Sequence, residues 1–484
     1  MKRPDAIVVG SGPNGLAGAL TLARAGLTVE VYEGSPTLGG GCRTEEMTLS
    51  GFRHDVCAAV HPLVVASPFF QAAGLTAGTL TLLTPEVAFA HPLDNGRAVA
   101  VMTSLNDTAR GLGGDASTYT RMIAPLVRHA DEIVAGVLAP LREVPAHPLA
   151  LARFGLNGVL PARTLGRRFT TDQGRALVAG VAAHSMLRLT APLSGAFWLL
   201  LTMLAHRGGW PVVQGGSVGI VEALVARLEA EGGLLRTSRW VRSLDDLPPV
   251  PIVLVDVGPR QLIDLAGPRL SPRQRRALGR FAYGPGVCKV DWALDGPVGW
   301  EADPCREAVT VHVGGTMDEI AFSESEVAAG RHPAFPYCIV VQPSVVDPTR
   351  APAGCQTLWA YCHVPSGSPR NMAGAIEDQI ERFAPGFRDR ILQRSVITAA
   401  QMQIRDPNYI GGDINGGSAT LAQTLFRPTP RWNPYRTGID GVYMCSASTP
   451  PGGGVHGMCG YWAARAALAD LGLTPPSLIE SGQD

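Results

Sequence analysis

A strand–loop–helix–strand pattern at the start of the chain constrains the fold more than any other sequence feature. The apolar run 6–9 predicts a buried strand, and it leads directly into Gly10-Ser11-Gly12-Pro13-Asn14-Gly15, which has the spacing GxGxxG. Apolar residues then recur at helical spacing over 16–23, and 28–32 reads as a second strand. The pattern predicts a βαβ unit that opens an α/β fold with a doubly wound parallel sheet.

The loop and the second strand carry the residue types that a dinucleotide needs. Gly10 permits a tight turn, Gly12 lets the backbone approach a diphosphate, and Gly15 lets the helix pack on the strand. Glu33 lies 18 residues after Gly15, where its carboxylate can accept hydrogen bonds from a ribose diol. A purely structural glycine turn is the alternative. The expected dinucleotide contacts are Gly10, Gly12, Pro13, Asn14, Gly15 and Glu33.

Composition excludes several other classes of protein. The 484 residues include 41 basic and 41 acidic side chains, and this zero net charge argues against a nucleic-acid partner. The nine cysteines form no CxxC pair, which predicts reduced thiols and no zinc or other metal site. The apolar runs are too short for a spanning helix, which needs about 18 apolar residues. We expect a cytoplasmic protein, with contact to a membrane surface left open.

The segment after Glu33 indicates which dinucleotide is bound. It contains Gly39-Gly40-Gly41-Cys42-Arg43 and resembles the FAD-binding flavoproteins that carry a glycine doublet here, the superfamily of amine oxidases and phytoene desaturases. In those families arginine follows the doublet, whereas this chain has Gly41 there and Arg43 two residues later. The resemblance implies FAD contacts from Gly40, Gly41 and Arg43, with a phosphate contact from Arg43. A simple glycine loop is the alternative.

The C-terminal region repeats the strand, glycine loop and helix order. A strand is predicted over 441–445, followed by a loop that contains Pro451-Gly452-Gly453-Gly454-Val455, and then a helix to about 471. This arrangement resembles the phytoene-dehydrogenase-related oxidoreductases, in which such a loop lies along the flavin. The resemblance also implies that 212–244 returns to the FAD domain, with Trp240-Val241 on a strand and the Val241 backbone against the adenine. The flavin contacts that it implies at this end are Ser446, Gly453, Gly454, Val455 and His456.

These observations predict a two-domain protein. Its discontinuous Rossmann-like FAD-binding domain is expected to comprise 1–65, 210–287 and 435–484. A mixed α+β substrate-binding or cap domain is expected to comprise 66–209, which reads as mainly helical, and 288–434, whose strand-like runs suggest a sheet under the substrate pocket.

Three side chains are candidates for the chemistry. Lys289 lies on a predicted strand and resembles the amine-oxidase lysine that reaches flavin N5 through a water; a surface lysine on an alternating strand is the alternative. His61 falls where the chain leaves the FAD domain and could be a base or a substrate contact. His456 could supply a proton or positive charge at the flavin, or be a hydrogen-bonded structural histidine.

Two motifs that are absent from the sequence indicate which molecule supplies the electrons. No second GxGxxG follows the strand at 252–255, and Cys42 has Met47 rather than a partner cysteine nearby. We therefore expect dehydrogenation of a largely apolar, lipophilic substrate by hydride transfer to flavin N5, with oxygen, a quinone or another acceptor taking the electrons. An amine oxidase and a non-catalytic protein that retains FAD are the alternatives.

Overall fold

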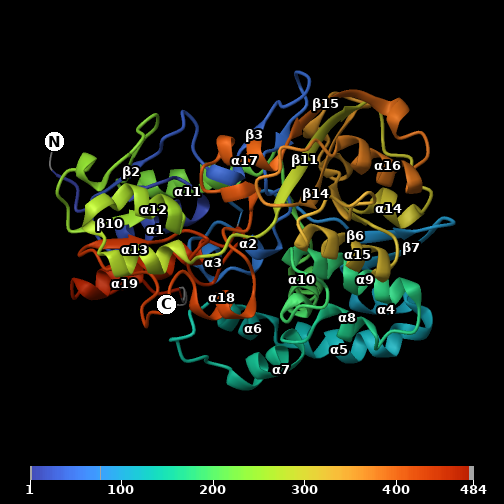
Figure 1. Cartoon of the computed structure of the whole chain (residues 1–484), viewed down its shortest axis with the longest axis horizontal. Coiled ribbons are helices and arrows are strands. Elements are labelled where there is room, and N and C mark those ends of the chain that lie inside the picture. The colour runs from blue at the N-terminus through green and yellow to red at the C-terminus, as the bar shows by residue number, and fades with distance from the viewer. Residues whose placement is uncertain (1–2, 77, 479–484) are drawn as a thin grey trace.

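A computed structural model describes residues 3–76 and 78–478. A five-stranded sheet forms one half of the molecule, at the left of Figure 1, and each of its neighbouring strand pairs is parallel. The strand order is β16-β10-β1-β2-β9. The strands are β1 (Ala6–Val9), β2 (Val29–Tyr32), β9 (Leu234–Arg236), β10 (Ile252–Val255) and β16 (Val442–Met444). This is the predicted Rossmann-like sheet, and it joins both ends of the chain.

The central strands are apolar throughout because helices cover both faces of the sheet. Ala6 and Val8 point into the core cluster that includes α1 and α19, whereas Ile7 and Val9 point into the cluster that includes α12. The helices around this sheet are α1 (Pro13–Arg24), α11 (Val218–Ala230), α12 (Pro259–Ala266), α13 (Pro272–Gly279) and α19 (Met458–Asp470). Strand alternation therefore fixes which helix packs against which face.

A seven-stranded sheet forms the other half of the molecule (Figure 1). Its order is β15-β11-β14-β13-β12-β6-β7, and all pairs are antiparallel except β12 with β6. The strands are β6 (Val87–Leu93), β7 (Arg97–Met102), β11 (Gly286–Leu294), β12 (Thr310–Val313), β13 (Cys338–Val341), β14 (Gln356–Val364) and β15 (Ile391–Ile397). Two-stranded ladders join β3 (Thr44–Glu45) to β4 (His54–Asp55), and β5 (Leu82–Leu83) to β8 (Val212–Val213).

Helices from the middle of the chain form a layer against the second sheet, at the lower right of Figure 1. They are α4 (Leu105–Gly111), α5 (Ala116–Arg128), α6 (Ala130–Val137), α7 (Pro148–Gly158), α8 (Ala162–Gly166), α9 (Asp172–Ala182) and α10 (Ser194–Gly208). The remaining helices are α2 (Pro62–Ala66), α3 (Pro68–Ala72), α14 (Asp303–Glu307), α15 (Met317–Ala328), α16 (Ala373–Phe383), α17 (Ala399–Arg405) and α18 (Leu421–Phe426). Within the described ranges, no helix has the length and apolar character to cross a membrane.

The structure corrects one expectation about strands. Trp240 and Val241 lie in no strand. The edge strand of this region is β9, which begins at Leu234, six residues before Trp240. The region 66–209 is mainly helical, as predicted, and it also contributes the hairpin of β6 and β7 to the second sheet. The strands of the parallel sheet all come from the three segments predicted for the FAD-binding domain, while the predicted domain boundaries remain predictions.

Candidate functional site

A cavity of about 1040 Å³ connects the two halves of the molecule. One end is lined by loops at the carboxyl ends of β1, β2 and β10, which is where open parallel sheets bind ligands. The other end is lined by side chains of β12, β13 and β14 from the second sheet. The predicted site residues that line it are Gly10, Gly12, Pro13, Asn14, Glu33, Gly40, Gly41, Arg43, His61, Val241, Ser446, Gly454 and Val455. Gly15, Lys289, Gly453 and His456 are not among the lining residues.

The glycine loop between β1 and α1 has no room for side chains. Gly10 has a φ of 100°, a left-handed conformation that favours glycine. A Cβ at Gly15 would collide with the carbonyl oxygen of Gly10, and one at Gly12 would lie 2.6 Å from Oδ2 of Asp256. Gly12 is the N-cap of α1 and provides no capping side chain, so the loop leaves helix N–H groups at the cavity.

Glu33 is held at the cavity by hydrogen bonds from the glycine loop and from the backbone two residues after it. Its Oε2 accepts hydrogen bonds from the Ser11 amide at 3.0 Å and the Ser11 hydroxyl at 2.6 Å, and its Oε1 accepts from the Ser35 amide at 2.8 Å. These donors fix the carboxylate, while each oxygen keeps capacity for another donor. The predicted contact of Glu33 with a ribose stays a prediction.

The second glycine stretch folds back on the first. Gly40 and Gly41 lie in the short 3₁₀ helix Gly40–Cys42, and a Cβ at Gly41 would collide with the Tyr409 hydroxyl. The Arg43 guanidinium donates to the Gly40 carbonyl at 2.8 Å and to the Ser35 hydroxyl at 3.3 Å. Arg43 is thus held next to Glu33's partner Ser35, and its predicted phosphate contact stays a prediction.

The C-terminal loop reaches the middle of the cavity. Ser446, Gly454 and Val455 line it, and the Ser446 hydroxyl donates to the Val257 carbonyl at 2.8 Å. Gly453 does not line the cavity, and a Cβ there would lie 2.7 Å from the carbonyl oxygen of Asn415, which does. The two chain ends therefore meet at one cavity.

His456 is occupied by the loop's own backbone. Its Nε2 lies 3.1 Å from the Gly452 carbonyl, and its Nδ1 accepts from the Met458 amide at 3.1 Å. Burial lowers the pKa of His456 to about 4. The ring is neutral at physiological pH with both nitrogens used, and this geometry favours the structural interpretation of this histidine.

His61 faces the cavity with one nitrogen unused. Its Nε2 lies 2.8 Å from the Ser217 hydroxyl, which itself donates to the Ala58 carbonyl. Ser217 must therefore accept from His61, and the ring proton sits on Nε2. The buried Nδ1 has no hydrogen-bond partner among the described residues. Burial lowers the pKa of His61 to about 4, so the ring is neutral at neutral pH and the buried Nδ1 keeps its lone pair.

Lys289 is buried, which excludes the alternative that it is a surface lysine on an alternating strand. Only 2% of the residue is exposed, its ammonium is paired with Asp291, and it lies 5.1 Å from the centre of the Trp359 ring. Burial raises the pKa of Asp291 against the opposing effect of Lys289. The pair lies beneath Trp359, which lines the cavity, so Lys289 contacts the cavity wall and not the cavity itself.

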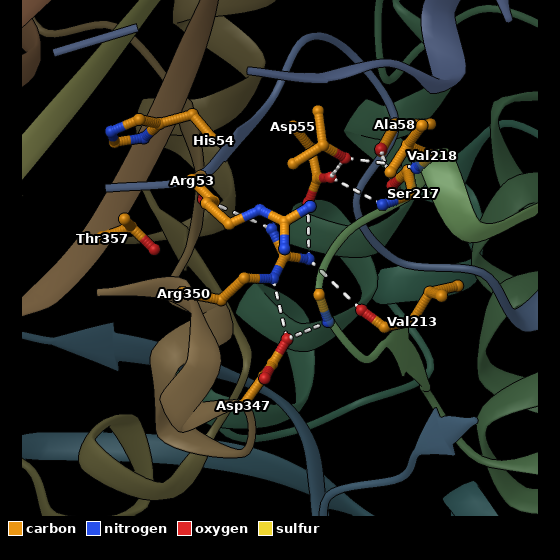
Figure 2. A network of polar contacts seen from close by, with 12 residues as sticks. Arg53, His54, Asp55, Ala58, Val213, Ser217, Val218, Asp347, Arg350 and Thr357 are labelled. Atoms are coloured by element: carbon orange, nitrogen blue, oxygen red, sulfur yellow. Dashed lines mark hydrogen bonds and ion pairs between the residues drawn. The ribbon is translucent and has the colours of Figure 1, made fainter. Parts of the chain in front are cut away.

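A buried ion-pair network ties the site to the second half of the molecule (Figure 2). Arg350 donates to Asp55 at 2.9 Å and to Asp347 at 2.8 Å, and the three side chains are fully buried. Asp55 also accepts from the Ser217 amide at 2.8 Å, and Asp347 accepts from the Gly215 amide at 2.7 Å. Burial alone would raise the pKa of Asp55, but Arg350 and the hydrogen bonds hold it below its ordinary value. The network thereby positions the serine on which His61 depends.

The sequence analysis missed Asp256, which follows β10 at the same sheet edge as Glu33. Its Oδ2 accepts from the Gly15 amide at 2.9 Å. Burial raises the pKa of Asp256 to about 7, and the charges of Asp406 and Glu33 add to this shift. An acidic residue directly after a buried parallel strand was the available signal.

Comparisons with known proteins agree with this geometry. Residues 8–71 match the model of the NAD(P)-binding Rossmann-like domain family. A rat protein named pyridine nucleotide-disulfide oxidoreductase domain-containing protein 2 is 25% identical over 96% of this chain and 94% of its own length. One of the subunits of the limonene dehydrogenase from Castellaniella defragrans is 24% identical over 98% and 96%. A neurosporene-forming phytoene desaturase from Rhodobacter capsulatus is 29% identical over 25% of this chain and 24% of its own length.

Solved structures share the whole fold. An oxidoreductase from Methanosarcina mazei superposes with a TM-score of 0.62 at 17% identity, covering 96% of this chain and 99% of the other. A redesigned putrescine oxidase superposes with a TM-score of 0.61 at 15% identity, covering 97% and 99%. The chain is therefore a relative of the phytoene desaturases within the oxidoreductase superfamily, with a Rossmann-like dinucleotide-binding sheet.

Proposed function

We propose that the chain is an FAD-dependent oxidoreductase that dehydrogenates a largely apolar, lipophilic substrate by hydride transfer to flavin N5, with oxygen, a quinone or another acceptor taking the electrons. The observation that carries this proposal is the cavity that joins the glycine loop and Glu33 to an apolar wall on the second sheet. The names of the relatives that act on limonene and carotenoids support an apolar substrate.

The residues at the parallel-sheet end fit FAD. The glycine loop would hold the diphosphate against the N-terminus of α1, and Glu33 would bind the ribose of the adenosine half. Asn14 lines the cavity, and its side-chain oxygen is buried without a partner among the described residues. Asp256 contacts the glycine loop, and its neutral form would not repel the diphosphate that we propose for this loop.

FAD would supply a two-electron acceptor, and the chain would position the substrate and take up its proton. His61 is our candidate for the base or substrate contact, because the residue lines the cavity and its Nδ1, which is buried in this structure, has no partner among the described residues. Lys289 stays a predicted catalytic residue, although its position beneath Trp359 favours a positioning role. The predicted catalytic role of His456 is likewise less favoured, because its ring nitrogens are used.

An anaerobic titration tests the proposal. Purified protein should show a flavin absorption band, and terpenes or polyenes should bleach it while reducing the cofactor. Bleaching by amines alone, with hydrogen peroxide released when oxygen is readmitted, would instead establish the amine oxidase. A flavin that no ligand bleaches or perturbs would support the non-catalytic FAD-retaining protein, and protein that binds no flavin would refute the proposal.

A membrane surface is our proposed source of the lipophilic substrate. The segment around α7 exposes large apolar side chains: Val144 is 92% exposed, Leu149 85% and Leu156 74%. Such side chains can enter the interfacial region of a bilayer. Co-sedimentation with phosphatidylcholine vesicles should be lost in a Leu149→Ser/Leu156→Ser variant, and equal sedimentation of both proteins would contradict this location.

A further inference from the structure

The cavity end on the second sheet borders a row of buried histidines. Thr310 on β12, Ile339 on β13 and Tyr361 on β14 line the cavity. His312 follows two residues after Thr310 and is paired with Ile339, so it shares the face of the sheet that these residues present. His312 is 1% exposed and lies beyond the edge of the cavity.

His184 connects this row to the cavity. It lies in the 3₁₀ helix Ala183–Ser185 between α9 and α10, is partly exposed, and lines the cavity. Its Nε2 is 2.8 Å from Nε2 of His312, and the two rings meet edge to face at 4.9 Å. His312 is therefore the inner partner of a hydrogen-bonded pair, and His184 is the outer one.

The hydrogen bonds determine which nitrogen of each ring carries the proton. Burial lowers the pKa of His184 to about 3 and that of His312 well below its ordinary value, so both rings are neutral. Nδ1 of His312 is buried without a partner among the described residues. A proton there would be an unsatisfied buried donor, at a cost of about 1–3 kcal/mol, even though His184 could then donate to His312 from its own Nε2. His312 thus donates from Nε2, and His184 must carry its own proton on Nδ1.

The walls around His184 are mostly apolar. Leu201, Trp210, Ile339 and Val341 line the same end of the cavity, and the polar groups beside them are the hydroxyls of Thr310 and Tyr361, neither of which forms a hydrogen bond with His184. Trp210 donates its own N–H to the Thr310 hydroxyl at 2.9 Å. The nearby carboxylate of Glu324 is not a lining residue and is bound to His363 at 2.9 Å. Among the described residues no hydrogen bond involves Nδ1 of His184.

We propose that His184 donates a hydrogen bond from Nδ1 to an oxygen of the substrate, and that His312 sets this donor by holding the tautomer. The substrate class is then an apolar molecule that carries a carbonyl or hydroxyl oxygen, rather than a plain hydrocarbon or an amine. The assignment of the bound molecule as substrate rests on the proposed function, whereas the donor itself rests on the His184–His312 pair.

Three ligands with one carbon skeleton test the donor. Limonene, perillyl alcohol and perillaldehyde differ at a single carbon, which bears hydrogen only, a hydroxyl or an aldehyde oxygen. Quenching of Trp210 and Trp359, which line the cavity, reports binding to the anaerobic holoenzyme whether or not the flavin is bleached. A failure of turnover is therefore distinguishable from a failure of this proposal.

The readout is the ratio of the limonene Kd to the perillaldehyde Kd, compared between variants so that differences in water solubility cancel. His184→Phe should lower this ratio about tenfold, the value of one hydrogen bond near 1.4 kcal/mol. His184→Gln keeps an N–H donor and should recover part of the ratio. An unchanged ratio in His184→Phe would overturn the proposal.

The tautomer gives a second test. In His312→Leu, either tautomer of His184 is available, so the variant should show a weaker preference for the aldehyde but keep that for the alcohol, which can donate or accept. His91→Leu is the matched control: this buried histidine on the same sheet face donates to the Gly315 carbonyl and does not line the cavity, so the ratio should not change.

In histidine-labelled wild-type protein, long-range ¹⁵N–¹H spectra should show His184 protonated on Nδ1. A proton on Nε2 of His184 would overturn the proposal, whatever the variants do.

Discussion

Replacing Arg350 by methionine removes the cation at the centre of the network in Figure 2 while keeping much of the side-chain volume. Arg350 serves two carboxylates, Asp55 and Asp347, whose side chains have no exposed surface. Breaking a buried ion pair by removing one partner costs about 3–5 kcal/mol, because the remaining charge stays buried. Two carboxylates lose their cation here, so we expect about 4–5 kcal/mol in the free energy of unfolding at pH 7.

The pH dependence of this loss identifies its cause. In the wild type the pKa of Asp55 lies below its ordinary value, so its contribution is present above the unfolded pKa and is lost as pH falls through the folded pKa. In Arg350→Met, burial is opposed only by the hydrogen bonds from Ser217 and Thr44, and we expect the pKa of Asp55 to rise above its unfolded value. The stability of the variant then falls as pH rises from 5 to 7, and the gap to the wild type widens.

Urea unfolding followed by far-UV circular dichroism at pH 5 and pH 7 measures both effects. Adding Asp55→Asn to Arg350→Met should recover part of the loss, because a neutral amide tolerates burial better than a lone carboxylate. Arg331→Met is the control: Arg331 is paired with Glu326 but leaves 60% of its side chain exposed, so its midpoint should hardly move. A loss below about 1 kcal/mol at pH 7, typical of an exposed pair, would refute the reasoning.

Three further perturbations test the dinucleotide end of the cavity. Glu33→Gln should weaken FAD retention about tenfold, measured by flavin absorbance after dialysis, because it removes the charge-assisted acceptor; an unchanged flavin content would contradict the ribose role. Gly15→Ala should abolish flavin retention because its Cβ meets Gly10, whereas Gly111→Ala, with open space around it, should retain flavin fully. The pKa of Asp256 is raised to about 7, so its stabilising effect is lost as pH rises towards 7; Asp256→Asn should flatten the decline in thermal midpoint between pH 5 and 8.

Local patterns were enough to predict the parallel sheet but not its edge. β1 and β10 are buried on both faces and read as continuous apolar runs next to glycine. β9 is a short edge strand whose Leu234 is half exposed, and the strand predicted at Trp240 came from the family resemblance rather than from a local pattern. The hairpin of β6 and β7 had a usable signal, because Asn95 and Gly96 both have positive φ in the turn between the strands.

Some features of the candidate site were likewise predictable from local sequence and others were not. Glu33 was predictable because its position depends on one βαβ unit, and the structure holds it by the neighbouring loop. The surroundings of Lys289 and His456 were not predictable, since burial beneath Trp359 and bonding to Gly452 depend on packing between distant segments. Sequence alternation correctly placed Lys289 and Asp291 on one side of a strand, yet it assigned no partner or depth to that side.

The cavity end on the second sheet tolerates substitutions differently from the glycine loop. His184, Thr310, Ile339 and Tyr361 come from four separate elements, and the register of β12, β13 and β14 brings three of them together. A shift of one residue in β12 would turn His312 to the opposite face of the sheet. Single substitutions on this fixed register alter the group offered to a ligand without disturbing the dinucleotide loop. Relatives that share the fold can therefore differ in substrate, and ligand preference must be measured at His184 rather than inferred from the glycine motif.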